Sequence, residues 1–451
     1  MKNQKRKWSL TAAGMLATLT LGATAYGQSA DALIDKLVDK GILTVKEAND
    51  LREETDKGFN QAAQVKSGIP DWITSFKLGG DLRGRYEGIY TKGENSADRN
   101  RFRYRLRFGL TASMTDDLEV GFRLASGTLT DPISPNQTMG GNAVRKTIGI
   151  DLAYAKWTPL HKSDWTGTFV GGKMENPFVF SDLVFDPDYM PEGLAQQFGY
   201  AFSDKQSLKF MLGEFVLDEI GASSKDPFLV GAQLRLDSVW TKKLQTSFGV
   251  AALAISGKDT LSTGGDNLMH PGNNVPNVNV GNTRTPVVGG VGGNLVYNYN
   301  PIVVDGALIY TLDSFPLYKG VFPIKLAGEY MNNPGASANN QAYSVGIQFG
   351  KSGKKGLWDI SYNWKYLEAD AWWEELVDSD FGGFYAVAPP GGSQGFQCGT
   401  GVRGHIIKAT FSPYDSLTFG AKFFMTELIN PYPAGSKSGA SRIQLDAAWR
   451  F

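Results

Sequence analysis

"RFRYRLRFGLTASM", Arg101–Met114, is the stretch of sequence that decides the fold, because charged and apolar side chains alternate along it. The arginines are Arg101, Arg103, Arg105 and Arg107, and the residues between and after them are Phe102, Tyr104, Leu106 and Phe108. An α-helix, with its period of 3.6, would scatter both sets around its axis. A β-strand places alternate residues on opposite faces, so the arginines share one face and the apolar residues share the other. The stretch therefore predicts a strand between a wet surface and an apolar one.

A soluble, half-buried strand would explain this one stretch equally well, so the rest of the chain has to decide. Period-2 alternation continues from Trp72 onward, and short polar turns alternate with long loops rich in Gly, Asn and Pro. Many candidate strands have about ten residues, the length that crosses a bilayer when tilted, whereas strands of soluble sandwiches average five or six. Five tryptophans lie near strand ends, where an interfacial girdle would place them: Trp157, Trp165, Trp240, Trp358 and Trp449. These features favour lipid as the partner of the apolar face and an outer-membrane barrel as the fold.

The N-terminus predicts an export signal over residues 1–27. Lys2, Lys5, Arg6 and Lys7 precede an apolar stretch and then small residues. The apolar stretch is shorter than the ~20 residues of a membrane span, which disfavours the alternative of an N-terminal anchor. Cleavage removes four positive charges from a chain with 45 basic and 45 acidic residues. The mature chain is thus slightly acidic, and no basic excess indicates a nucleic-acid partner.

Residues 28–66 predict a short helical periplasmic segment before the barrel. An apolar stripe occupies Asp31–Lys40, and Thr44–Glu47 forms a capping box that opens a second short helix. Helices near ~12 residues are marginal in isolation, so the stripe requires a partner. An oligomerisation or tethering element and a loosely ordered leader are equally favoured.

Strand parity sets the size of the barrel predicted for residues 72–451. Seventeen candidate strands are found, but a single-chain barrel with both ends in the periplasm has an even number. The weakest candidate is Val287–Asn298, whose four glycines weaken a ladder, and we assign it to an external loop. The prediction is an all-β fold, a single antiparallel transmembrane β-barrel of 16 strands, with 18 as the alternative.

Enzyme chemistry has no support in the sequence. There is no G-x-S-x-G, and "GKS" at Gly350 lacks the upstream glycine of a phosphate loop because Val345 stands there. His161, His270 and His405 are too scattered for a metal site or a nucleophile–base pair, and the single cysteine, Cys398, lies in a Gly-rich loop. We expect no catalytic residue, no metal and no cofactor.

Several motifs carry a resemblance to a known family. The chain ends in "SRIQLDAAWRF", Ser441–Phe451, an amphipathic strand with Trp449 and Phe451 on its apolar face; it is similar to the segment by which bacterial outer-membrane barrels are recognised for assembly. The wider chain resembles the putative porin family of Gram-negative bacteria. The motifs that carry this resemblance are "ALIDKLVDKGILTVKEANDL", "GGKMENPF", "SDLVFDPDYMPEGLA", "YLEADAWWEELVDSDFGG" and "RGHIIKATF". The resemblance implies an outer-membrane channel whose partners are membrane lipid, the barrel-assembly machinery and small solutes or anions, with a homotrimer as the assembly to consider.

Topology places a constriction at Asn176–Gly193, the third external loop, after a fifth strand at Gly167–Glu175. In general porins, which this chain resembles in architecture, that loop folds inward. Here it carries the acids Asp182, Asp186, Asp188 and Glu192 beside the apolar anchors Phe178, Phe180, Phe185 and Tyr189. An exposed surface loop is the alternative.

Seven arginines from three consecutive strands form a basic wall in this prediction: Arg83, Arg85, Arg101, Arg103, Arg105, Arg107 and Arg123. Facing the loop acids, they would set a transverse field in a wet pore and favour anions. Asp81 and Glu87 pairing with neighbouring arginines is the structural alternative, although it would leave a surplus of unpaired arginines. The predicted function is passive diffusion of small hydrophilic solutes and ions. The competing class is a barrel that serves as adhesin or anchor and displays loops such as Gly257–Asn300 and Ala369–Gly401.

Overall fold

A computed structural model of the chain describes residues 69–93, 97–219, 226–261, 280–286, 293–389 and 393–451. The predicted signal peptide and helical segment, residues 1–27 and 28–66, lie outside the described residues. Within the described ranges, no helix has the length and apolar character needed to cross a membrane.

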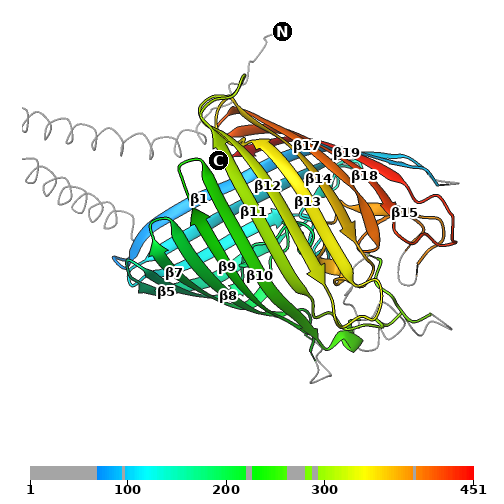
Figure 1. Cartoon of the computed structure of the whole chain (residues 1–451), viewed down its shortest axis with the longest axis horizontal. Coiled ribbons are helices and arrows are strands. Elements are labelled where there is room, and N and C mark those ends of the chain that lie inside the picture. The colour runs from blue at the N-terminus through cyan, green and yellow to red at the C-terminus, as the bar shows by residue number, and fades with distance from the viewer. Residues whose placement is uncertain (1–68, 94–96, 220–225, 262–279, 287–292, 390–392) are drawn as a thin grey trace, which may run out of the picture. The chain divides into compact units, whose positions relative to one another are not determined.

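Sixteen antiparallel strands close into a barrel (Figure 1). They are β1 (Ile73–Thr91), β2 (Arg99–Met114), β3 (Leu118–Ser126), β5 (Ile148–His161), β6 (Trp165–Lys173), β7 (Glu192–Ser203), β8 (Gln206–Val216), β9 (Phe228–Val239), β10 (Leu244–Ser256), β11 (Ile302–Leu312), β12 (Phe322–Asn332), β13 (Gln341–Gly350), β14 (Leu357–Leu367), β17 (Val402–Tyr414), β18 (Leu417–Leu428) and β19 (Ala440–Arg450). Each strand pairs with its neighbours along the chain, and β1 pairs with β19 from Asp81↔Arg450 to Thr91↔Ala440. The predicted barrel of 16 strands is confirmed, and the alternative of 18 is wrong.

Other short elements lie in the connections between barrel strands. Strand β4 (Gln137–Thr138) pairs with β2, and β15 (Gly382–Tyr385) forms a hairpin with β16 (Gly395–Cys398). Two 3-10 turns, η1 (Lys258–Thr260) and η2 (Glu374–Leu376), complete the described structure. No barrel strand lies between β10 and β11, so the described part of the Gly-rich segment, residues 293–298, belongs to a loop as predicted.

The two rims of the barrel differ in the length of their connections. One rim, the short-turn rim, has tight turns such as residues 115–117, 162–164 and 204–205. The opposite, long-loop rim carries connections such as residues 127–147, 257–301 and 368–401. All five tryptophans singled out in the sequence lie at the short-turn ends of their strands: Trp157, Trp165, Trp240, Trp358 and Trp449. This placement matches one interfacial belt of aromatic side chains.

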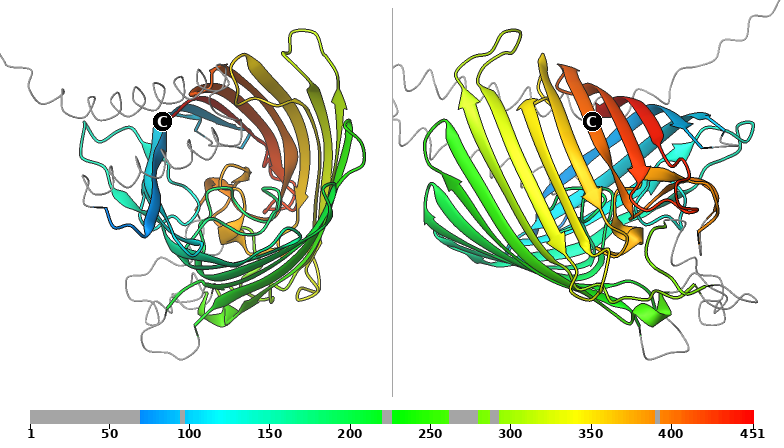
Figure 2. Two further views of the ribbon diagram at one scale, coloured as in Figure 1. Left: turned by 90° about the vertical axis from the view of Figure 1, so that its left-hand side faces the viewer. Right: turned by 45° about the vertical axis from the view of Figure 1, so that its right-hand side comes forward.

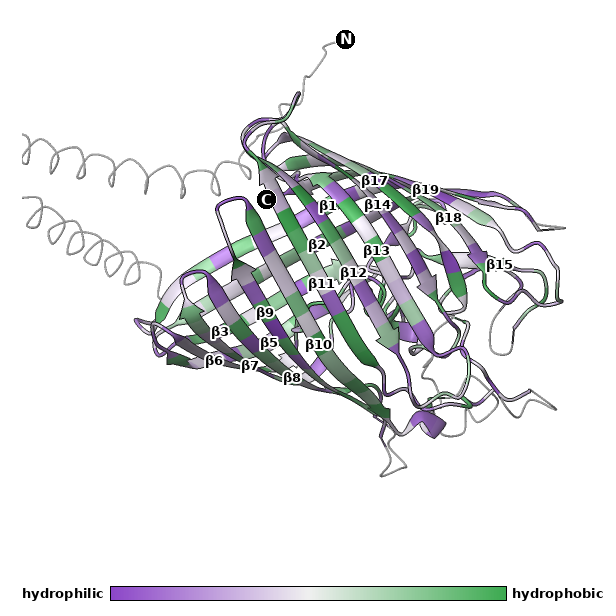
Figure 3. Ribbon diagram, viewed as in Figure 1, coloured by the Kyte–Doolittle hydropathy of each residue, from purple (hydrophilic) through white to green (hydrophobic). Residues whose placement is uncertain are grey.

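The alternation read from Arg101–Met114 determines which face of the wall each side chain occupies. Phe102 and Phe108 are 60% and 46% exposed on the outer surface, while Arg103 between them is 9% exposed and points inward. Apolar and polar bands alternate along the other strands in the same way (Figure 3). A continuous apolar surface of this extent is unusual for a soluble monomer and fits the hydrocarbon layer.

Two long connections fold into the barrel and fill part of the lumen (Figure 2, left). The third loop, residues 174–191, lies between β6 and β7, and the seventh loop, residues 368–401, lies between β14 and β17. They meet in a buried apolar cluster that includes Phe185 of the third loop and Trp372 of the seventh. The largest apolar cluster of the described residues is therefore inside the barrel, between loops and wall.

Two glycines lie at the base of the third loop, where β6 ends and β7 begins. Gly172 and Gly193 face each other in the β6–β7 ladder and have φ values of 116° and 151°. A Cβ atom on Gly193 would lie 2.1 Å from the Glu214 carbonyl oxygen, so only glycine fits there. Strand β6 ends at Lys173, which places Glu175 in the loop and corrects the predicted strand end.

Candidate functional site

The seven predicted arginines lie on the inner face of β1, β2 and β3, but their charges are largely paired. Arg105 and Arg107 bind Asp81 of β1 at 2.8 and 2.6 Å and Asp188 of the third loop at 3.1 and 3.4 Å. Arg123 contacts Asp151 at 2.5 Å and Glu175 at 3.0 Å. These contacts form a layer of ion pairs where the third loop meets the wall.

Arg85, Arg101 and Arg103 form ion pairs nearer the long-loop rim. Arg85 contacts Asp446 of β19 at 2.7 Å and Asp380 of the seventh loop at 3.3 Å. Arg101 contacts Oε1 of Glu87, and Oε2 of the same carboxylate is 3.7 Å from Arg103 and 2.5 Å from Arg442.

Arg83 differs from the other six arginines. Its Nη2 donates a hydrogen bond to Asn136 Oδ1 at 2.5 Å, and within the described ranges it has no carboxylate at ion-pair distance. The expected surplus of unpaired arginines is therefore reduced to Arg83 among the described residues. The other six arginines are paired because acids of β5, β19 and the seventh loop, which are remote in the sequence, lie against this wall.

The four predicted loop acids contact different partners, so they do not form one row opposite the arginines. Asp188 binds Arg105 and Arg107, whereas Asp182 reaches Lys365 of β14 at 3.2 Å. Glu192 lies at the start of β7 and pairs with Lys173 at 2.9 Å on an exposed surface.

Asp186 joins the two inward loops. It accepts hydrogen bonds from the backbone N–H of Asp188 at 2.8 Å and from that of Ser379 at 2.9 Å. Burial, with the neighbouring Asp378 and Asp188 carboxylates, raises the pKa of Asp186 well above its ordinary value. The third and seventh loops are thus one packed unit.

The seventh loop corrects the expectation of a displayed external segment. It leaves and rejoins the wall at the long-loop rim, but Trp372 and Trp373 are 0% and 3% exposed, and Glu374 is fully buried against Arg284. Its hairpin packs on the wall through the hydrogen bond from Thr426 Oγ1 to the Gly382 carbonyl oxygen. The signal in the sequence was the pair of adjacent tryptophans among acids, which an exposed loop would rarely carry.

Lys365 is a residue that the sequence placed on the polar face of its strand without assigning it a role. Its ammonium is fully buried between Asp182 at 3.2 Å and Asp378 at 3.4 Å, and it lies over the Phe381 ring at 4.4 Å. One cation of the wall therefore holds an acid from each inward loop.

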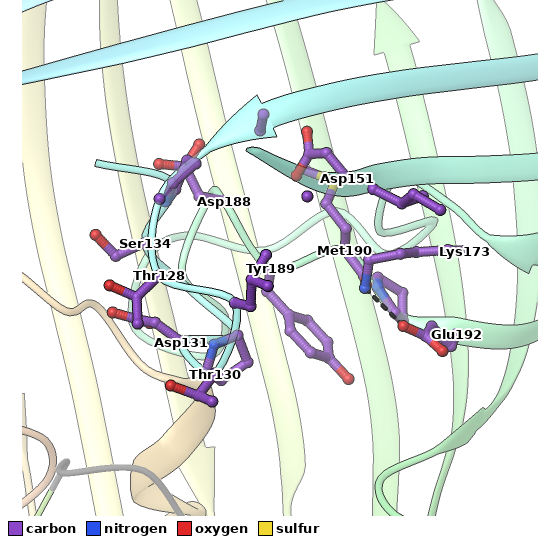
Figure 4. Close-up of a pocket in the computed structure, with 18 of the residues that line it drawn as sticks. Thr128, Thr130, Asp131, Ser134, Asp151, Lys173, Asp188, Tyr189, Met190 and Glu192 are labelled. Atoms are coloured by element: carbon purple, nitrogen blue, oxygen red, sulfur yellow. Dashed lines mark hydrogen bonds and ion pairs between the residues drawn. The ribbon is translucent and has the colours of Figure 1, made fainter. Parts of the chain in front are cut away.

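Two cavities lie on either side of the Arg105–Asp188 contact. The cavity toward the long-loop rim has a volume of about 600 Å³ and is lined by Asp188 and Tyr189, together with residues of the second loop such as Asp131 (Figure 4). The cavity toward the short-turn rim has a volume of about 720 Å³ and is lined by Arg105 and Arg107.

Neither a candidate metal site nor a readily ionised thiol is present in the described part of the chain. No group of three His, Cys, Asp or Glu residues there has the geometry to hold a metal ion. Burial raises the pKa of the Cys398 thiol to about 12, so it remains protonated.

Comparison with known proteins agrees with this geometry. Residues 90–258 match a protein family described as putative porin. Among solved structures, a high-pH structure of Pseudomonas putida OprB aligns with a TM-score of 0.51 at 12% identity, covering 88% of this chain and 97% of that one. Vibrio cholerae OmpT lacking loop L8 (TM-score 0.45, 9% identity, 84% and 100% covered) and Salmonella typhi OmpF with daunomycin (TM-score 0.44, 9% identity, 83% and 97% covered) are also similar. No curated protein matches the chain.

The matched segment contains all of β2, all of β3 and the whole third loop, so it includes the members of the ion-pair layer other than Asp81 of β1. The likeness to OprB extends over nearly the whole barrel and shows the fold. The chain is thus a barrel with the fold of an outer-membrane porin, and its residues 90–258 are similar to the putative porin family.

Proposed function

We propose that the protein is an outer-membrane porin that forms a water-filled channel for passive diffusion of small hydrophilic solutes and ions. One observation carries this proposal: an apolar outer face encloses an interior with two cavities, of about 600 and 720 Å³, that charged side chains help to line. A barrel that only anchors or displays loops has no need of such an interior. The signal at residues 1–27 delivers the chain for export, and Trp449 and Phe451 present the terminal strand to the assembly machinery.

An anion preference is proposed from the cavity on the short-turn side. Its charged lining consists of Lys77, Arg105, Arg107, Arg123, Lys156 and Arg450 against Asp81, Glu119 and Glu175. This basic excess concentrates anions next to the ion-pair layer, in low-dielectric surroundings that strengthen its field. The preference is moderated by pairing of the arginines and by the mainly acidic lining of the other cavity.

Conductance of the purified full chain in planar bilayers tests the proposal. We expect stepwise channel currents and a zero-current potential in a KCl gradient that indicates chloride preference, greater at low salt because screening is weaker. Insertion without conductance would instead favour the adhesin or anchor. Cross-linking of the same preparation tests whether the chain forms the homotrimer that the family resemblance implies.

A further inference from the structure

The contact between Asp188 and the pair Arg105 and Arg107 separates the two cavities. Asp188 lines the cavity on the long-loop side, and the two arginines line the cavity on the short-turn side. The contacts of Asp188 with Arg105 and Arg107 therefore lie at the boundary between the two cavities.

The two carboxylates on this arginine pair are held differently. Asp81, on β1, is bonded at 2.6 to 3.0 Å by Arg105 Nε, Arg105 Nη2 and Arg107 Nε. Asp188, on the third loop, is bonded only by the Nη1 atoms at 3.1 to 3.4 Å. The shorter and more numerous bonds to Asp81 make it the permanent partner, while the outer N–H groups of both arginines point to Asp188.

We propose that Arg105 and Arg107 are the binding site for the carboxylate or phosphate group of a permeating solute, and that Asp188 occupies this site when no solute is present. This inference rests on the proposed channel function and adds the substrate class, small solutes with a carboxylate or phosphate group. The planar guanidinium forks match both kinds of oxyanion.

Exchange at this site keeps the two guanidinium groups neutralised, while the displaced Asp188 carboxylate turns into the cavity that it lines. The two arginines are neutralised by Asp81 and Asp188, so a singly charged solute group that replaces Asp188 leaves no unpaired guanidinium. The backbone of Asp188 is tied to Asp186, so only its side chain has to move, and the cavity that it already lines has room for it. Neither strand nor loop has to unfold.

Removal of the internal carboxylate should strengthen solute binding. We would measure binding of succinate and of inorganic phosphate to the detergent-solubilised full chain by isothermal titration calorimetry, for the wild type, Asp188→Asn and Arg105→Gln. Because the charged side chain that competes with the solute for the two arginines is removed, we expect about tenfold tighter binding in Asp188→Asn, and we expect loss of binding in Arg105→Gln. The two ligands show whether carboxylate, phosphate or both are accepted.

Asp305→Asn is the matched control, because Asp305 is also a luminal carboxylate bonded to an arginine, Arg235, at 2.8 Å, but on the opposite wall. It should leave binding unchanged. Equal affinities in Asp188→Asn, Asp305→Asn and the wild type would overturn the inference, as would binding retained in a folded Arg105→Gln. These titrations do not depend on conduction, so absence of current would count against the channel function alone.

Discussion

Lys365 is the residue at which both inward loops are fixed to the wall. Lys365→Met would leave the carboxylates of Asp182 and Asp378 buried without their cation. Removal of one partner of a buried ion pair costs about 3–5 kcal/mol of stability, so we expect the two loops to loosen at this contact and single-channel conductance to increase while the barrel stays folded. Planar-bilayer recordings and heat-modifiable electrophoretic mobility measure the two effects.

Lys408→Met is the matched control for this variant. Lys408 lies on the neighbouring strand β17 and is exposed, so the same substitution removes no buried charge. Equal conductance changes in the two variants would contradict the role assigned to Lys365.

Asp186 predicts a pH dependence for the contact between the two loops. Its raised pKa means that the folded protein holds this proton more tightly than the unfolded chain. The stability that protonated Asp186 contributes to the folded protein is fully present below its ordinary pKa of 3.8. This stability is lost as the pH rises through the raised pKa of Asp186. Amide exchange of Ser379, corrected for its intrinsic pH dependence, should therefore show stronger protection at acidic than at alkaline pH.

Two variants isolate the carboxyl group responsible. Asp186→Asn should abolish the pH dependence of Ser379 protection, while Glu192→Gln, which changes an exposed acid at the end of the same loop, should retain it. A pH dependence that persists in Asp186→Asn would assign it to another group.

At the scale of the element, β2 tests which side of the wall faces lipid. Leu106 is on the outer, apolar face, and Thr111 is on the inner face and lines the short-turn cavity. Leu106→Arg should destabilise the barrel in lipid by about 2–4 kcal/mol if it lies near the midplane, whereas Thr111→Arg should be tolerated. Urea unfolding from lipid vesicles gives both values, and the reverse order would mean that the strand is inside out.

At the scale of the whole molecule, strand parity predicts that the connection between β10 and β11 faces the cell exterior. Asn298 is exposed on this connection. In a Cys398→Ser background, Asn298→Cys should react with a membrane-impermeant thiol reagent on whole cells. Lys242→Cys, in a turn at the opposite rim, should react only after the cells are broken. Labelling of Lys242→Cys and protection of Asn298→Cys on intact cells would reverse the topology.

The sequence by itself determined the wall of this protein. Alternation along a strand is a local property, because each Cβ points opposite to the one before it, so Arg101–Met114 was enough to separate a charged face from an apolar face, and the rest of the chain indicated that the apolar face meets lipid. The strand number followed from parity, which is a constraint on the whole chain that needs no coordinates. The glycines of Val287–Asn298 and the polar turns supplied the remaining information.

Only the tertiary structure decided what fills the lumen and which charges meet there. Arg85 and Asp446 are 361 positions apart, and Lys365 and Asp182 are 183 apart. Such partners are set by barrel closure and by the paths of two loops, and no periodic pattern encodes either. Side chains of the wall alternate with a period of two residues, and this pattern is visible in the local sequence. The ion-pair layer instead depends on tertiary contacts between segments that are remote in the sequence.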